Sequence, residues 1–148
     1  MQIRKFRKAD ARNVSDLIKK CLLEVNNKDY SKKIIDFICK HHVSKKLILY
    51  SIERSVFVAE EKGKILGTAS LKDNVIKTVF VNPKFHGKGI GSKLMNTVET
   101  LAKKRGCKTV VVPSSITAYE FYKQRGYKKV KVVYSSEYGK IIRMRKKL

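Results

Sequence analysis

Three glycines at alternating positions, Gly87, Gly89 and Gly91, follow a β-rich segment at residues 75–81, and an amphipathic pattern begins directly after them. A strand that passes through a glycine loop into a helix is typical of an anion site. The first N–H groups of such a helix lack partners, and glycines admit a phosphate close to the backbone. The spacing GxGxG fits neither the dinucleotide motif GxGxxG nor a P-loop. The pattern therefore indicates either a diphosphate-binding loop or a tight turn that binds no ligand.

Alternating strand-like and helix-like segments must position this loop. We expect helices capped by Asp10 and by Ser31, a helical turn at 45–52, and a long helix after the three glycines. A further short helix is expected to be capped by Ser114 and Ser115 and to run through Arg125. Strands are expected at 3–6, 56–60, 64–72, 75–81, 109–112, 127–134 and 140–146. This order predicts an α+β fold with a mostly antiparallel sheet and a parallel insertion. No repeat or linker is visible, so residues 1–148 are expected to form one domain.

The composition describes a basic polypeptide of ordinary globular character. Of its 148 residues 43% are hydrophobic, which permits a sizeable core and argues against disorder. No apolar run reaches the roughly 18 residues of a spanning helix, and the N-terminus lacks a signal-peptide core, so we expect no membrane partner. Cys21, Cys39 and Cys107 form no CxxC or Cys/His pattern. The cysteines thus predict neither disulfides nor a metal site, as in a cytoplasmic protein.

Positive charge dominates the chain: 35 Lys+Arg oppose 12 Asp+Glu, a formal net charge of +23. Much of the excess lies in clusters at 103–105, 128–129 and 145–147, and such runs are usually solvated faces. A field of this sign also attracts phosphates of nucleic acid, of a nucleotide cofactor or of anionic lipid. The charge indicates a class of partner without defining a function.

A second segment, 115–127, reads SITAYEFYKQRGY, and together with the glycine loop it resembles the GNAT superfamily of acyl-CoA-dependent N-acyltransferases. The family's first motif, [QR]xxGxG/A after a strand, lies on His86 to Gly91. Its second, an Asn or Ser followed by AxxFYxxxGF, lies on Ser115 to Tyr127. The hairpin VFVAEEKGKILGTASL is similar to the family's second and third strands. The resemblance covers nearly the whole chain in the right order.

The resemblance implies a mixed, three-layer α+β fold. Its central sheet would have about seven mostly antiparallel strands, flanked by helices and splayed between 75–81 and 109–112 to form a cofactor slot. It also implies an N-acetyltransferase, in which a primary amine attacks acetyl-CoA directly through a tetrahedral intermediate. A backbone N–H near Val81 would donate to the oxyanion. No metal is expected to take part.

The resemblance also assigns roles to individual residues. The pyrophosphate would lie on the loop formed by His86, Gly87, Lys88, Gly89, Ile90 and Gly91. The pantetheine amides would pair with the backbone of Val79, Phe80 and Val81, and Ser115 would contact the cofactor. Tyr122 would protonate the departing thiolate. The alternative for Tyr122 is a core aromatic beside Phe121, because aromatics at helical spacing commonly pack.

Two positions depart from the family pattern. Residue 86 is His where Gln or Arg is usual, so the expected cradle depends on backbone groups rather than on this side chain. Val110 stands where some members carry a glutamate, so the amine must lose its proton by another route, such as ordered water. Carboxylates at Glu24, Glu60 and Asp73 are expected to be solvated. The pair at 41–42 is expected to end a polar helix rather than to form a site.

A second function remains open on this sequence. The chain could be a catalytically weak, GNAT-like basic module that binds nucleic acid or ribosomes. As an enzyme, its partners would be acetyl-CoA and an unidentified amine, with nonspecific nucleic-acid binding as a side effect of charge, and it would be a monomer or a homodimer. The acceptor would be selected by the weakly patterned segment 21–54 and by the C-terminal hairpin.

Overall fold

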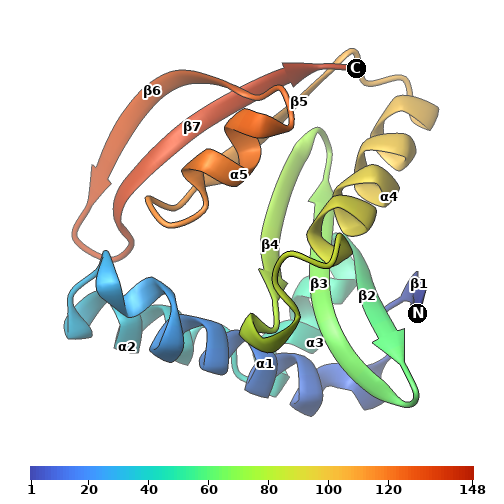
Figure 1. Ribbon diagram of the computed structural model, residues 1–148, viewed down its shortest axis with the longest axis vertical. Coiled ribbons are helices and arrows are strands. Elements are labelled where there is room, and N and C mark those ends of the chain that lie inside the picture. Colours follow the sequence, from blue (N-terminus) through green and yellow to red (C-terminus); the bar gives the residue numbers. More distant parts are fainter.

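The computed structural model describes residues 1–148, which form a seven-stranded sheet with helices on both faces (Figure 1). The strand order is β1-β2-β3-β4-β5-β7-β6, and only β4 and β5 run parallel. The strands are β1 (Gln2–Lys5), β2 (Ser55–Glu61), β3 (Lys64–Lys72), β4 (Val75–Val81), β5 (Thr109–Ser114), β6 (Lys128–Ser135) and β7 (Gly139–Lys147). The helices are α1 (Ala11–Glu24), α2 (Lys32–Lys40), α3 (Ser44–Glu53), α4 (Ile90–Lys104) and α5 (Tyr119–Gln124).

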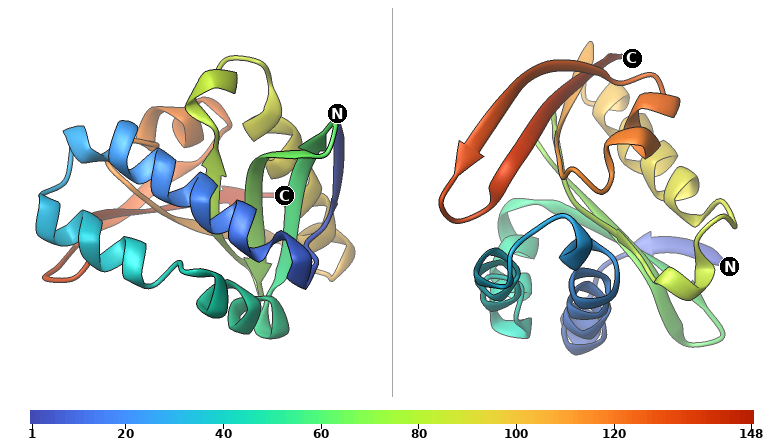
Figure 2. Two further views of the ribbon diagram at one scale, coloured as in Figure 1. Left: turned by 90° about the horizontal axis from the view of Figure 1, so that it is seen from below. Right: turned by 60° about the vertical axis from the view of Figure 1, so that its left-hand side comes forward.

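Two hydrophobic clusters hold the layers together. Helices α1 to α3 cover one face through Val14, Ile18, Leu22, Ile35 and Leu47, which pack with Val58 of β2. Helices α4 and α5 cover the opposite face, as Figure 2 shows, and their apolar residues pack against β3, β5 and β7. The expected α+β fold, with a mostly antiparallel sheet flanked by helices, is therefore confirmed. None of the helices is long and apolar enough to cross a membrane.

Adjacent strands β4 and β5 separate almost as soon as they meet. Their ladder contains a single pair, Val75 with Val111, supported by a bond from Val111 N to Asn74 O at 2.9 Å. Beyond this pair the edge of β4 that faces β5 has no strand partner. The splayed sheet expected from the sequence is thus present, and it opens toward the C-terminal end of β4.

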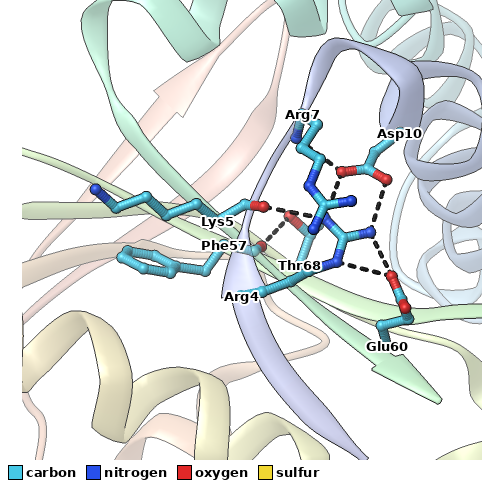
Figure 3. Close-up of polar contacts among 7 residues, drawn as sticks. All are labelled: Arg4, Lys5, Arg7, Asp10, Phe57, Glu60 and Thr68. Carbon is cyan, nitrogen blue, oxygen red and sulfur yellow. Dashed lines mark hydrogen bonds and ion pairs between the residues drawn. The ribbon is translucent and has the colours of Figure 1, made fainter.

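One sequence expectation is wrong at the start of α1. Asp10 precedes that helix but makes no capping bond to it; its carboxylate accepts from the backbone N–H of Arg7 and from both Nη atoms of Arg4, at 2.8 and 2.9 Å (Figure 3). Arg4 Nε also donates to Glu60 Oε2 at 2.7 Å. Glu60, expected to be solvated, is therefore half-buried in an ion pair that joins β1 to β2. The guanidinium competes for the carboxylate more effectively than the neutral N–H groups of α1.

Candidate active site

A cavity of about 920 Å³ opens where β4 and β5 separate. One wall is β4, from Ile76 to Val81. The glycine loop lies at the Val81 end of this wall, and Arg54 lies toward the other end, beside Thr78. Residues of α1, α2, α5 and the turn between β6 and β7 also line the cavity. The cavity thus exists because the sheet is splayed, and it brings the two motifs of the sequence to one place.

A β-bulge interrupts β4 inside this cavity. The register against β3 shifts between Thr68 and Ser70, so Thr78 and Val79 of β4 together face Ala69. Thr78 has a φ of +55°, a left-handed conformation that is rare for a β-branched residue. Such strain persists only where the surroundings enforce it, and it is concentrated at functional sites. The bulge re-aims backbone groups of β4 at the centre of the cavity wall.

The backbone at the end of β4 is directed into the cavity. Asn82 N bonds to Leu66 O of the β3 side at 2.8 Å, so by alternation the polar groups of Val81 point away from β3. The Val81 carbonyl accepts from Cys21 Sγ at 3.2 Å and lies 2.8 Å from His86 Nε2. Val81 N–H is left on the open edge. Phe80 and Val79 also line the cavity.

The glycine loop presents a row of backbone N–H groups. Gly87 and Gly89 adopt φ values of +77° and +81°. The first bond of α4 runs from Lys93 N to Gly89 O, so the N–H groups of Ile90, Gly91 and Ser92 have no backbone acceptor. This end of the helix also carries the positive end of the helix dipole. Free N–H groups at the positive end of a helix dipole are suited to bind an anion.

Close packing at Gly91 joins the two motifs. A Cβ at this position would lie 3.1 Å from Cζ of Phe121 and 3.2 Å from its Cε1, closer than side chains normally approach. Glycine therefore lets α5 approach the start of α4. The side chain of His86 folds back onto β4, and Lys88 is exposed with its Nζ 5.4 Å from the centre of the Phe85 ring. Lys88 does not line the cavity, and the His86 ring lines it with Nε2 engaged by Val81 O, so the free N–H donors of this region are those of the backbone.

Tyr122 of α5 is both packed and placed at the cavity. It is 6% exposed. Its ring lies edge-to-face with the rings of Phe121 and Tyr127, with centroids 5.2 and 5.7 Å away. Its hydroxyl has no hydrogen-bond partner in the protein, and the residue lines the cavity. Burial raises the pKa of Tyr122 well above its usual value of 10, so the phenol is protonated at neutral pH. The side chain can act as a proton donor.

Ser115 lines the cavity one turn before α5. Its Oγ accepts from Ala118 N at 3.1 Å, so it caps the turn that leads into that helix. The capping role that the sequence predicted for Ser114 and Ser115 therefore belongs to Ser115. The hydroxyl remains at the cavity wall and retains its own donor.

Further side chains line the cavity toward its other end, and apart from His42 the sequence did not single them out. They are Tyr30, His42, Tyr50, Arg54, Lys77 and Tyr138. Apart from Lys77, they lie in the segment 21–54 and the C-terminal hairpin, where the sequence placed acceptor selection without naming residues. Single polar residues scattered over several elements leave no periodic signal, and only the fold brings them together.

His42 follows the end of α2, as expected, but its ring faces the cavity. Its Nδ1 lies 2.7 Å from Ile38 O, which leaves Nε2 without a protein partner. Burial lowers the pKa of His42 below 6.5, so the imidazole is neutral at pH 7. A neutral imidazole whose Nδ1–H donates to a carbonyl offers Nε2 as a proton acceptor.

The cavity is positively charged and contains no carboxylate. Arg54 and Lys77 line it, whereas no Asp or Glu does. The thiol of Cys21 also faces it, but burial raises the pKa of that thiol to about 12, which makes it a poor nucleophile. No group of His, Cys, Asp and Glu side chains is arranged to hold a metal ion. The available chemistry is therefore hydrogen bonding by backbone groups and proton transfer by a phenol and an imidazole.

Comparison with known proteins defines the class. The family profile described as "Acetyltransferase (GNAT) domain" matches residues 16–148, so the chain belongs to the GNAT acetyltransferase family. An uncharacterized N-acetyltransferase of Methanocaldococcus jannaschii is 35% identical over an alignment of 95 positions, and the match covers 55% of this chain. The match spans only 42% of that relative's length, less than half.

Solved structures share the whole fold. A GCN5-related N-acetyltransferase from Rhodopseudomonas palustris superposes with a TM-score of 0.93 at 25% identity, covering 99% of this chain and 95% of that one. The PaiA N-acetyltransferase from Thermoplasma acidophilum, solved in complex with coenzyme A, has a TM-score of 0.83 at 19% identity and covers 99% and 98% of the two chains. The family and the fold that the sequence motifs indicated are thus confirmed.

Proposed function

We propose that residues 1–148 form one N-acetyltransferase domain that transfers an acetyl group from acetyl-CoA to a primary amine. The observation that carries the proposal is the continuity of one cavity. It begins at the free N–H groups of the glycine loop, follows the open edge of β4, and reaches the unpartnered hydroxyl of Tyr122. A diphosphate, an extended amide chain and a leaving thiolate each find a suitable group along this path.

The loop fits the diphosphate of acetyl-CoA. Its N–H groups at Ile90, Gly91 and Ser92 are free, and the helix dipole favours an anion at that position. The loop residues proposed to bind are His86, Gly87, Lys88, Gly89, Ile90 and Gly91, the first and third through their backbone. The complex of the Thermoplasma acidophilum protein with coenzyme A supports this cofactor.

The open edge of β4 is proposed to hold the pantetheine arm. Val79 and Val81 offer backbone groups to its amides, Phe80 packs against it, and Ser115 contributes a hydroxyl from the opposite wall. When bound, acetyl-CoA supplies an acetyl group activated as a thioester. Backbone N–H groups at the bulge of β4 then donate to the carbonyl oxygen as negative charge develops on it.

Proton transfer is assigned to two side chains. The amine nitrogen forms a bond to the carbonyl carbon, the carbon–sulfur bond breaks, and the thiolate takes the proton of the Tyr122 hydroxyl. His42 Nε2 accepts the proton that the amine releases, since the imidazole is neutral and faces the acceptor end. Return of that proton to Tyr122 through solvent restores both groups, and the net products are an N-acetylated amine and free coenzyme A.

The test is thiol release from acetyl-CoA across a panel of amines, with a control that contains no acceptor. We expect release that depends on the amine, accompanied by a product heavier by one acetyl group. Binding of acetyl-CoA without transfer to any amine would contradict the enzymatic proposal. The alternative of a nucleic-acid-binding module has no support from the family match or from the structural relatives.

A further inference from the structure

The cavity contains a second positively charged region, separate from the glycine loop. Arg54 and Lys77 form it, next to the bulge residue Thr78. From Lys77 to Val81 a strand rises by about 13 Å, and the glycine loop begins only after Val81. A diphosphate bound at the start of α4 therefore does not reach Arg54 and Lys77. These two cations are available for a different ligand.

Arg54 is held firmly but is not neutralised from within the cavity. Its guanidinium carbon lies 4.2 Å from the centre of the Tyr50 ring, and Nη1 donates to Thr78 Oγ1 at 3.4 Å. The side chain is 12% exposed, and its buried Nε has no hydrogen-bond partner. The carboxylate of Glu53 is 3.5 Å from Nε, but Glu53 is half exposed and does not line the cavity. Most of the five N–H donors of the guanidinium remain for a ligand.

Lys77 adds a second charge beside Arg54. Burial, and after it the neighbouring charges of Arg54 and Lys72, lower the pKa of Lys77, while Glu53 acts in the opposite direction. Two cations in a partly buried site repel one another, and an anion between them relieves the repulsion. No carboxylate lines the cavity to do so. Glu53 partly offsets these charges from outside the cavity, but inside the cavity only a ligand can place an anion beside them.

The C-terminal hairpin contributes Tyr138 and Ile141 to the cavity lining. Its turn lies next to α2, as Figure 1 shows. Tyr30 Oη donates to Lys140 O at 2.7 Å. The rings of Tyr138 and Phe37 lie edge-to-face, with centroids 5.3 Å apart. A Cβ on Gly139 would lie 2.8 Å from Cδ1 of Ile34, so the turn is in tight contact with α2. This tightly packed turn favours a small acceptor over a side chain on a folded protein.

We propose that the acceptor is a small primary amine that also carries a carboxylate or a phosphate, and that Arg54 and Lys77 bind this anionic group. The inference rests on the proposed acetyl transfer and specifies its substrate class. The planar fork of Arg54 suits two oxygens of one anion. A polycationic amine meets two like charges and no carboxylate, so the same residues discriminate against it.

The first test compares amines that differ only in the anion. Thiol release from acetyl-CoA is measured with O-phosphoethanolamine and ethanolamine, glucosamine 6-phosphate and glucosamine, and glycine and its methyl ester, with spermidine as the polycation. We expect kcat/KM to be roughly 30-fold or more higher for the anionic member of at least one pair. The phosphate and carboxylate pairs show which anion is preferred. Equal rates within every pair, or preference for spermidine, would overturn the inference and leave acetyl transfer standing. Failure of every amine would overturn both.

Variants connect the preference to the two residues. Arg54→Gln should lower the ratio of anionic to neutral kcat/KM by roughly 30-fold, and Lys77→Met should lower it less. Lys64→Met is the matched control, because Lys64 is an exposed lysine at the start of β3 that does not line the cavity. A variant that folds less completely lowers both kcat/KM values by the same factor, so the ratio does not change. A ratio unchanged in both cavity variants would contradict the assignment.

A binding measurement is independent of turnover. The preferred anionic amine is titrated calorimetrically into protein saturated with coenzyme A, which has no acetyl group to donate. Binding should weaken roughly 30-fold in Arg54→Gln, be partly restored in Arg54→Lys, and be unaffected in Lys64→Met. Equal affinity of the wild type and Arg54→Gln would overturn the proposed anion site.

Discussion

Replacement of Gly89 by alanine tests whether the backbone of the loop binds the cofactor. Gly89 has a φ of +81°, and a Cβ added there meets no atom within 4 Å, so the cost is conformational rather than steric. An alanine in the left-handed region costs about 1–2 kcal/mol. Gly63 is a matched control, since it has a φ of +77°, an equally open environment, and a place in the turn between β2 and β3.

The two variants should lose similar stability but differ in binding. If strain at residue 89 turns one N–H away from the diphosphate, the loss of one charge-assisted hydrogen bond costs about 1.5–3 kcal/mol. That corresponds to a roughly 10- to 100-fold weaker Kd for coenzyme A. Urea denaturation measures the stability, and calorimetric titration with coenzyme A measures the affinity. Equal Kd values for Gly89→Ala, Gly63→Ala and the wild type would refute the assignment of the loop to the diphosphate.

Three further predictions follow from single side chains. Tyr122→Phe should reduce kcat by ~10²-fold or more, with the Kd for coenzyme A unchanged, because only the proton donor is lost; steady-state kinetics with undiminished turnover would return Tyr122 to a packing role. In the wild type, kcat/KM corrected for ionisation of the acceptor should rise with pH through the pKa of His42, which burial lowers below 6.5. This loss of activity at acidic pH should disappear in His42→Gln. A pH profile identical in both proteins would exclude His42 as the base. Arg4→Met should lower the free energy of unfolding by about 3 kcal/mol, because it leaves the carboxylates of Asp10 and Glu60 without their cation. Because Arg4 lowers the pKa of Asp10, the Asp10 carboxylate stabilises the fold above its unfolded pKa of about 4, and this stability is lost as pH falls through the folded pKa. Chemical denaturation at pH 7 and pH 3 should therefore show a smaller change in the free energy of unfolding in Arg4→Met than in the wild type. An equal change in both proteins would contradict this role of Arg4.

Periodicity and turn chemistry made most of the fold predictable. The turn at Lys62 and Gly63, with φ values of +51° and +77°, joins β2 and β3 where the sequence placed a hairpin. The glycines at 87–91 likewise located the start of α4. These signals are local, because each depends on the conformations available to a few consecutive residues.

Long-range pairings were not predictable from the sequence. The ion pair of Arg4 with Asp10 and Glu60 joins residues from two strands and a turn, and a carboxylate by itself does not reveal its partner. The bulge at Thr78 was also missed, since threonine is ordinarily a strand former and its positive φ is imposed by the register between β3 and β4. Tertiary structure supplies both features.

The residues of the site also divide into those with a local sequence signal and those without one. The loop and Tyr122 lie within contiguous motifs, so the sequence identified them. Arg54 and His42 come from the ends of helices without a recognisable pattern, and Lys77 is one lysine among many in a chain of net charge +23. Their common position at the acceptor end of the cavity became visible only in three dimensions.

The central claim is that the acetyl group passes directly from the thioester to the amine within one cavity. Initial-rate kinetics, in which the concentrations of both substrates are varied, test this claim most directly. Thiol release is measured against acetyl-CoA at several fixed concentrations of the best amine. The proposed function places the two substrates together in one cavity, and the Cys21 thiol that faces it has a pKa of about 12. We therefore expect intersecting double-reciprocal lines and no acetylated protein by intact mass. Parallel lines, together with an acetyl group on the protein after incubation with acetyl-CoA alone, would contradict direct transfer.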